Sequence, residues 1–209
     1  QHPPDHDRPG RGIRKIPDFN TGDNEGISYF HVNQKRGRRW SAARGFLKPA
    51  LTRPNLRLEK NVLVDRLVVE QGRVAGVRFM QDGQVVEARA KGEVVLTAGS
   101  IGSIQVLHRS GIGPAEWLSP LGIDVVLDKQ GVGRNLQDHL QQRAIYKVSN
   151  VRTLNETYWS LFRRGLMGLD YAFRRRGPLT MAPSQLGIFT RSDPERQRAN
   201  IQFHVQPLS

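Results

Sequence analysis

The chain has 209 residues, of which 37% are hydrophobic and 24% are charged, and this composition is typical of a globular protein and excludes a disordered or fibrous one. It contains no cysteine, which excludes a disulfide scaffold, a thiolate metal site and a cysteine nucleophile. The formal net charge of +13 would suit a nucleic-acid binder, but no zinc-finger spacing, aromatic RNA-binding motif or basic heptad region accompanies it. We therefore interpret the charge mainly as a solvated, arginine-rich surface.

The two ends of the chain bear on its origin. The first twelve residues are polar, and no apolar stretch reaches the roughly 18 residues of a membrane-spanning helix. We therefore expect no transmembrane segment and a cytoplasmic location. The chain does not begin with Met, and its last residues form an alternating pattern that stops without a cap. Both observations predict an internal fragment of a longer protein.

The first half of the chain predicts a loop, a short helix and a β-meander. Residues 1–38 are rich in Gly, Asp, Asn and Pro, which is typical of a long loop. Ser41 precedes a short helical pattern that ends near Pro49. Apolar and alternating runs then follow over residues 56–90, separated by Gln71-Gly72 and Asp82-Gly83. These dipeptides are hairpin-turn chemistry, so the segment predicts an antiparallel meander.

The second half alternates strand and helix patterns. Residues 93–98 predict a strand buried on both faces. After residues 99–103 a helical pattern follows through Ile104, Val106 and Leu107, and it ends at Ser110-Gly111. A short helix over 114–121, a strand over 123–127, an amphipathic helix over 155–175 and a strand over 201–204 complete the prediction. The fold class is therefore α/β (α+β overall).

Three stretches could carry chemistry. The first is a run of small residues at a predicted helix N-terminus: Thr97, Ala98, Gly99 and Ser100. A helix N-terminus favours a bound anion, and small side chains let a ligand approach the backbone closely. Small residues at such a turn also serve helix–strand packing. Residues 131–139 combine two glycines with Asn135, Asp138 and His139, either as a chemical site or as a loop held by hydrogen bonds. Residues 181–185 form a loop that either lines a pocket or connects two elements. The six histidines are scattered without metal-ligand spacing, so we predict no metal site.

Several motifs in order resemble one family, the glucose-methanol-choline (GMC) flavin oxidoreductases. Residues 99–113 are similar to the family's second signature, and only Ile104 departs from it. The other matches are Gly37–Ala43 (G-x-R-x-S-A-A), Arg53–Leu56 (R-P-N-L), Val132–His139 (V-G-x-N-L-x-D-H) and the stretch Arg176–Gln185, which is similar to the bacterial choline-dehydrogenase-like branch. The resemblance spans about residues 12–209.

The resemblance implies a fragment of an FAD-dependent oxidoreductase acting on the CH–OH group of a primary alcohol. In the family a histidine base takes the hydroxyl proton while hydride passes to flavin N5. The family's G-x-G-x-x-G and its catalytic histidine would lie outside this chain, so no catalytic residue is assigned here and the fragment alone is expected to be inactive. The partners would be an alcohol and an electron acceptor, either a quinone or dye or O₂, and a membrane would be approached only through the acceptor.

The resemblance also assigns site residues and domains. It implies FAD contacts at Val64, at Thr97, Ala98, Gly99 and Ser100, and near the flavin at Asn135, Asp138 and His139. Met181, Pro183, Ser184 and Gln185 would line the approach to the flavin. Residues 1–54 would bridge two domains, 55–140 would belong to a Rossmann-like FAD-binding domain, and 141–209 to a β-rich substrate-binding domain.

Two alternatives stay open at this stage. One is an oxidase of the same family that uses O₂ in place of a quinone or dye. The other is a non-catalytic basic protein that retains the fold and binds nucleic acid or another partner. The substrate alcohol is also open, because missing segments would complete the family's pocket.

Overall fold

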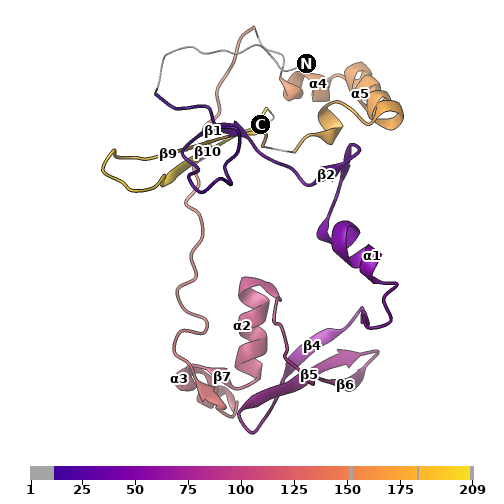
Figure 1. Ribbon diagram of the computed structural model, residues 1–209, viewed down its shortest axis with the longest axis vertical. Coiled ribbons are helices and arrows are strands. Elements are labelled where there is room, and N and C mark those ends of the chain that lie inside the picture. The colour runs from indigo at the N-terminus through magenta and orange to yellow at the C-terminus, as the bar shows by residue number, and fades with distance from the viewer. Residues whose placement is uncertain (1–11, 151–152, 183, 208–209) are drawn as a thin grey trace. The chain divides into compact units, whose positions relative to one another are not determined.

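The computed structural model describes residues 12–150, 153–182 and 184–207, and its chain divides into two units (Figure 1). Unit 1 consists of residues 1–53 and 143–209, and unit 2 consists of residues 54–142. The sequence-based boundaries lie within two residues of these divisions, but the N-terminal segment groups with the C-terminal one. The assignment of the parts to cofactor and substrate domains stays a prediction.

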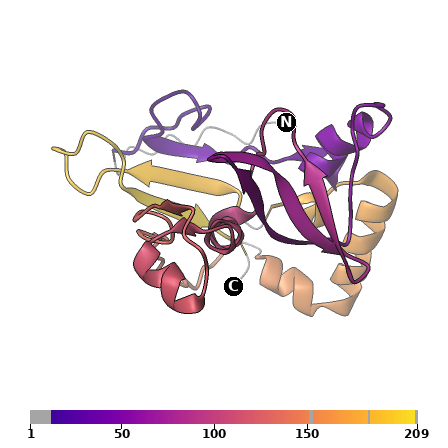
Figure 2. The same ribbon diagram turned by 90° about the horizontal axis from the view of Figure 1, so that it is seen from below.

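Unit 2 is built on an antiparallel meander of β4 (Leu63–Glu70), β5 (Arg73–Gln81) and β6 (Gln84–Arg89), which Figure 2 shows side by side. Both turns have positive φ at their two central residues, 49° and 76° at Gln71-Gly72 and 50° and 78° at Asp82-Gly83. This is the backbone of a type I′ turn, whose twist matches that of the strands it joins. The predicted meander is confirmed, although residues 56–58 are irregular.

Helix α2 (Gly99–Arg109) packs on β4 and closes the small core of unit 2. Val106 on the helix and Leu67 and Phe79 on the sheet are buried, with exposed fractions of 6%, 7% and 7%. The short strand β7 (Ile112–Gly113) follows and pairs in parallel with β8 (Leu127–Asp128). Between them lie α3 (Ala115–Leu118) and the 3₁₀ turn η2 (Ser119–Leu121), as the sequence predicts for residues 114–121.

A buried hydroxyl joins α2 to the sheet. Ser110 is 6% exposed, and its Oγ accepts the backbone N–H of Leu67 at 2.8 Å and donates to the Val106 carbonyl at 2.6 Å. Ser110→Ala leaves the Leu67 N–H buried without a partner, so we expect a loss of about 1–3 kcal/mol in the free energy of unfolding. Ser119→Ala, an exposed serine whose side chain caps nothing, is the control and should change it by less than about 0.5 kcal/mol. Equal urea midpoints for the two variants would contradict the assigned role.

Two strands predicted in unit 2 differ from the structure: one is absent and the other is much shorter. Residues 93–97 are irregular, and Val95 is 74% exposed where burial on both faces was expected. No described strand lies beside this segment, so its backbone groups have no ladder to join. Over residues 123–127 only Leu127 is in a strand, the two-residue β8.

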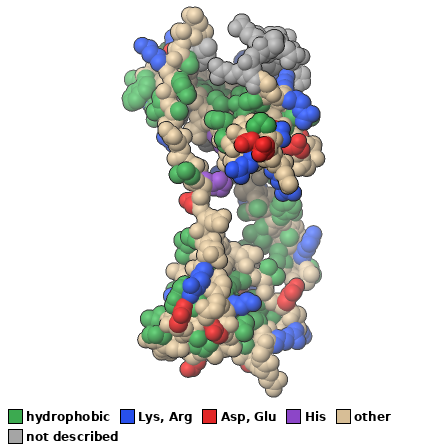
Figure 3. Space-filling view, turned by 90° about the vertical axis from the view of Figure 1, so that its left-hand side faces the viewer, with side chains coloured by type: hydrophobic (Ala, Val, Ile, Leu, Met, Phe, Trp, Pro, Cys, Tyr) green, Lys and Arg blue, Asp and Glu red, His purple; other side chains and the backbone are tan. Residues whose placement is uncertain are grey.

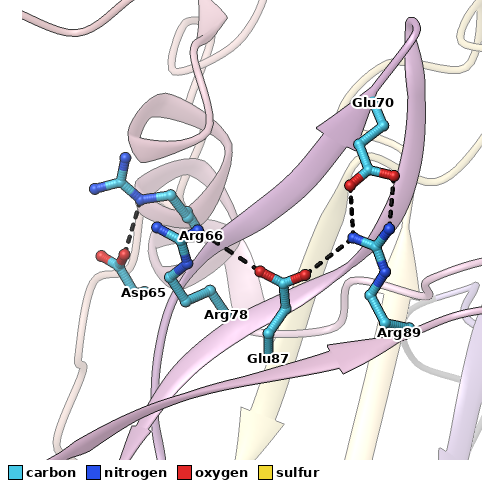
Figure 4. Close-up of polar contacts among 6 residues, drawn as sticks. All are labelled: Asp65, Arg66, Glu70, Arg78, Glu87 and Arg89. Carbon is cyan, nitrogen blue, oxygen red and sulfur yellow. Dashed lines mark hydrogen bonds and ion pairs between the residues drawn. The ribbon is translucent and has the colours of Figure 1, made fainter.

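An ion-pair chain crosses the outer face of the meander (Figure 4). The Arg89 guanidinium forms two hydrogen bonds with the Glu70 carboxylate, at 2.6 and 2.7 Å, and one with Glu87 at 2.9 Å. Arg78 lies 3.6 Å from the other Glu87 oxygen. The hydrogen bonds from Arg89 lower the pKa of Glu70, and those to Glu70 and Glu87 raise the pKa of Arg89.

The lowered pKa of Glu70 has a defined consequence for stability. A carboxyl with a depressed folded-state pKa stabilises the fold above its unfolded value of 4.5, and this contribution disappears as pH falls through the folded value. Arg89→Gln should therefore lower the melting temperature at neutral pH and low salt, and the difference from wild type should shrink towards about pH 3 and at high salt. Arg53→Gln, an exposed arginine with no ion pair among the described residues, is the control. A melting-temperature difference that stays constant with pH would contradict the account.

Unit 1 contains a three-stranded antiparallel sheet in the order β1-β9-β10, formed by Gly26–Tyr29, Leu186–Thr190 and Ile201–Val205. Phe19, Phe30 and Phe189 cluster against it with ring centroids 4.7–6.4 Å apart. The predicted loop over residues 1–38 is therefore wrong at β1 and at the hairpin of β2 (Gln34–Lys35) and β3 (Arg38–Arg39). Residues 1–11 lie outside the described residues.

The helices of unit 1 differ in length and number from those predicted. A π-helical turn η1 (Ala43–Leu47) runs into α1 (Lys48–Ala50), so the helix passes Pro49 by one residue. The helix predicted over 155–175 is two helices, α4 (Leu154–Trp159) and α5 (Leu161–Arg174). Ser160 separates them because its backbone is extended, with φ −89° and ψ 112°, while its Oγ accepts the Arg163 N–H at 3.4 Å. The 3₁₀ turn η3 (Pro178–Thr180) follows.

The mixed helix and strand content confirms the α/β (α+β overall) class. Many large apolar side chains are exposed in each unit, as Figure 3 shows on one face. Among the described residues no helix is long and apolar enough to span a membrane.

Candidate functional site

The predicted phosphate-type turn lies at the start of α2. Ala98 is the N-cap residue and no side chain caps the helix, so its first backbone N–H groups are open to an external acceptor. Gly99 has φ +81°, and a Cβ there would meet no atom within 4 Å. Thr97, Ala98, Gly99 and Ser100 are all exposed. The turn therefore offers uncapped donors beside open space, which is what a bound anion requires.

Val64 lies on β4, opposite Phe79, and is 36% exposed. A register shift follows it, at Asp65, whose carboxylate lies 3.9 Å from Arg109 at the last residue of α2. The 11 residues of α2 rise about 15 Å, so Val64 and Gly99 lie towards opposite ends of the helix. Both residues lie in unit 2, and their joint contact with FAD stays a prediction.

Asn135, Asp138 and His139 lie in an exposed, irregular segment of unit 2. Asn135 has φ +59°. The His139 backbone N–H donates to Asp138 Oδ1 at 2.7 Å, and the imidazole Nδ1 is 3.8 Å from the same oxygen. The Asp138 side chain is 99% exposed and that of His139 is 73% exposed, so neither is held in a catalytic geometry. Among the described residues, no hydrogen bond links these side chains to the turn before α2.

The start of the Val132–His139 motif packs on His108, a histidine that the sequence analysis did not identify as a site residue. His108 Nε2 lies 3.4 Å from the Val132 carbonyl, and its ring meets Trp117 edge to face at 6.2 Å. A Cβ at Gly113 would lie 2.6 Å from the His108 ring, and one at Gly133 would lie 3.2 Å from it. His108 therefore joins the two glycine-containing motifs. Its position within residues 99–113, the stretch similar to the family's second signature, could have indicated this role.

Met181, Ala182 and Gln185 line a hollow in unit 1, and Pro183 lies outside the described residues. The hollow has a volume of about 280 Å³, and its walls are Tyr29, Phe30, Val32, Gln34, Thr180, Met181, Ala182 and Gln185. The Phe30 N–H donates to the Gln185 carbonyl at 2.8 Å, and Gln34 Nε2 donates to the Thr180 carbonyl. Ser184 accepts a hydrogen bond from Gln206 at 3.2 Å and is not among the lining residues.

Tyr29, Phe30, Val32 and Gln34 were missed because residues 1–38 were interpreted as loop. The alternation over Gly26–Tyr29 was the signal that could have placed a strand there. Whether the hollow belongs to a route to the flavin stays a prediction.

Two carboxylates with a lowered pKa lie away from the hollow of unit 1. The backbone and side-chain N–H groups of Asn20 lower the pKa of Asp18, and the side chain of Gln81 lowers the pKa of Glu59. Neither carboxylate lines the hollow at Met181 and Gln185. A second hollow of about 750 Å³ lies at the β4–β5 turn and the end of β6, and it contains no predicted site residue. No group of three or more metal-ligating side chains occurs in the described part of the chain.

Known proteins match this chain over most of its length. The model of the family described as GMC oxidoreductase matches residues 10–141. The alcohol dehydrogenase [acceptor] of Pseudomonas putida is 40% identical over 193 residues, which cover 91% of this chain and 35% of that protein. The mitochondrial choline dehydrogenase of Homo sapiens is 40% identical over 196 residues, covering 94% and 33%.

A solved structure agrees in fold. A fungal aryl-alcohol oxidase superposes with a TM-score of 0.73 at 30% identity, covering 85% of this chain and 31% of that chain. The chain thus spans about a third of the length of the relatives it matches.

Proposed function

The chain belongs to the GMC oxidoreductase family, and from that premise we propose that it is part of an FAD-dependent enzyme that oxidises a primary alcohol. The observation that carries the proposal is 40% identity, over nine-tenths of this chain, to proteins named alcohol dehydrogenase and choline dehydrogenase. The activity belongs to the whole protein.

The residues at the start of α2 fit a dinucleotide. The uncapped helix N-terminus supplies backbone N–H donors and a positive dipole end for a pyrophosphate or a ribose oxygen. The absence of a Cβ at Gly99 keeps the backbone accessible. We propose that Thr97–Ser100 holds one part of FAD and that Val64 contacts the adenine part through its backbone. When bound, FAD would supply the acceptor for a hydride.

The proton acceptor for the alcohol is proposed to lie outside this chain. His204 stacks on Phe30 with ring centroids 4.9 Å apart, His108 packs against Trp117, and His139 is exposed. This chain would bind and orient the cofactor. The hollow lined by Met181 and Gln185 would admit the alcohol.

The identity of the cofactor tests the proposal. The full-length protein should release a yellow cofactor on heat denaturation, and phosphodiesterase should convert that cofactor to FMN with a rise in fluorescence. A colourless protein that binds no FAD when refolded with it would contradict the proposal.

Two finer points are also proposed. The acceptor is a quinone or dye, and the protein is cytoplasmic. The second candidate is an oxidase, favoured by the similarity to the aryl-alcohol oxidase, and hydrogen peroxide formed at the rate of alcohol oxidation would select it. The third candidate, a non-catalytic basic binding protein, rests on the net charge of +13 and would require DNA binding with a steep salt dependence.

A further inference from the structure

The side chain of His108 connects the end of α2 to the stretch that follows β8. His108 lies in the last turn of α2, and its Nε2 is 3.4 Å from the carbonyl oxygen of Val132, 24 residues further along the chain. Since a carbonyl oxygen only accepts, the imidazole must carry a proton on Nε2 for this hydrogen bond. The same ring meets that of Trp117, on α3, edge to face with centroids 6.2 Å apart. His108 therefore touches two separate segments that come after α2, whose end lies beside α3 and β7 (Figure 1).

The backbone around the imidazole leaves no room for larger side chains. A Cβ at Gly113 would lie 2.6 Å from the ring of His108. A Cβ at Gly133 would lie 3.2 Å from the same ring and 3.3 Å from the ring of Trp117. Gly113 does not have a positive φ in the left-handed region, so an alanine could adopt its backbone conformation. The close approach of the imidazole, and not the backbone, is therefore what requires glycine at this position.

Arg134 holds the same stretch from its exposed side. The Arg134 guanidinium lies over the face of the Trp117 ring, 4.6 Å from its centroid, and forms an ion pair with Glu116. Residues 132–134 are thus bound to α2 through the imidazole and to α3 through the arginine. We call the three side chains that make these contacts the His108 cluster: His108, Trp117 and Arg134.

The chain after the His108 cluster forms no hydrogen bond to the rest of unit 2 among the described residues. Residues 135–142 are irregular and exposed, and the hydrogen bond from the His139 N–H to Asp138 is local. Asn135, with φ +59°, turns the chain directly after the cluster. The cluster is therefore the last point at which contacts within unit 2 fix the position of the polar residues that follow.

We propose that His108 is a positioning residue for three polar side chains that follow the cluster, Asn135, Asp138 and His139. The inference rests on the proposed FAD-dependent function, in which these three residues are expected near the flavin. The imidazole donates to the Val132 carbonyl just before the segment that carries them. A change at His108 would therefore alter the dipoles and charge beside the flavin without removing any group that contacts it.

Two substitutions of His108 in the full-length protein separate positioning from packing. Leucine fills the space but donates no hydrogen bond, whereas the Nε2 amide of glutamine can replace the imidazole Nε2–H. We expect His108→Leu to raise the amide hydrogen-exchange rates of Val132 and Arg134 roughly threefold to tenfold. These amides donate to the carbonyls of Lys129 and Gly131 in the turn that the cluster holds. His108→Leu should also shift the visible absorption bands of the bound flavin, and His108→Gln should restore both properties.

Two further variants keep the test independent of folding. Ser110→Ala is the matched control, because it destabilises the same end of α2 while its hydroxyl bonds to Leu67 and Val106 and not to the His108 cluster. The flavin bands and the two exchange rates of this variant should match those of wild type. Arg134→Gln removes the exposed contact, and since the Arg134 side chain is 42% exposed the fold should persist. It should raise the same exchange rates and shift the flavin bands as His108→Leu does.

The outcomes that overturn the positioning role are distinct from failure of the proposed function. Unchanged flavin bands in His108→Leu, or in Arg134→Gln if His108→Leu does not fold, would overturn it. It would also be overturned if His108→Gln behaved like His108→Leu, or if Ser110→Ala shifted the bands equally, because packing or general stability would then be responsible. A wild-type protein without flavin would overturn the proposed function and with it this inference, whereas the exchange rates report the His108 cluster whether or not FAD is bound.

Discussion

Alanine at Gly111 should destabilise the protein by about 2–4 kcal/mol, among the largest effects expected of a single methyl group here. Gly111 has φ +75°, a conformation that costs a residue with a side chain about 1–2 kcal/mol. The added Cβ would also lie 2.2 Å from the Asp124 carbonyl oxygen and 3.0 Å from the Val126 nitrogen. Since the Gly111 carbonyl accepts hydrogen bonds from Val126 and Leu127, relief of this clash would disrupt the β7–β8 connection.

Gly122→Ala is the matched control. Gly122 has a similar φ of +70°, but a Cβ there would meet no atom within 4 Å. The Gly122→Ala variant should therefore lose only the conformational part of the stability, about 1–2 kcal/mol. The free energies of unfolding of the two variants, measured with urea, separate the clash from the backbone strain. Equal losses would show that Asp124 does not pack against Gly111 as described.

Glutamate at Gly99 should reduce the FAD content of the purified full-length protein at least about tenfold, which corresponds to about 1.4 kcal/mol of binding free energy. The position precedes the free N–H groups of α2, and a carboxylate there would occupy the open space and repel a pyrophosphate. The measurement is the ratio of flavin absorbance to protein absorbance after purification and after titration with FAD.

Gly72→Glu controls for backbone strain and for charge. Gly72 lies in the β4–β5 turn with φ +76°, and a Cβ there also meets no atom within 4 Å. The variant should therefore lose a similar amount of stability and keep its FAD. If Gly99→Glu retained full FAD content, the turn before α2 would not be a cofactor contact.

The elements that the sequence predicts well are those decided by neighbouring residues. Asp82-Gly83 specifies its turn because a short polar side chain and a glycine tolerate positive φ. The helix predicted through Ile104 to Leu107 ends where expected, with Ser110 as its C-cap residue, although it begins earlier than its pattern indicates, at Gly99. By contrast, residues 93–97 have the composition of a buried strand but lack a described neighbour to pair with.

The candidate site divides in the same way. The small residues at the start of α2 can be identified from the sequence because their role depends only on neighbouring residues, where an extended segment meets a helix. The hollow that contains Met181 and Gln185 is not, because its other wall, Tyr29–Gln34, lies about 150 residues earlier and meets it only after the chain folds. The break at Ser160 was missed because the helical period continues through it, while its extended backbone depends on the surrounding contacts.

Anaerobic addition of a primary alcohol to the full-length protein tests the central claim most directly. The account predicts that the visible flavin absorption is bleached as the alcohol is oxidised to the aldehyde, and that a quinone analogue or a dye restores it. A protein whose bound flavin stays oxidised with choline, aliphatic and aromatic primary alcohols alike, while dithionite reduces it, would contradict the assignment as an alcohol-oxidising enzyme.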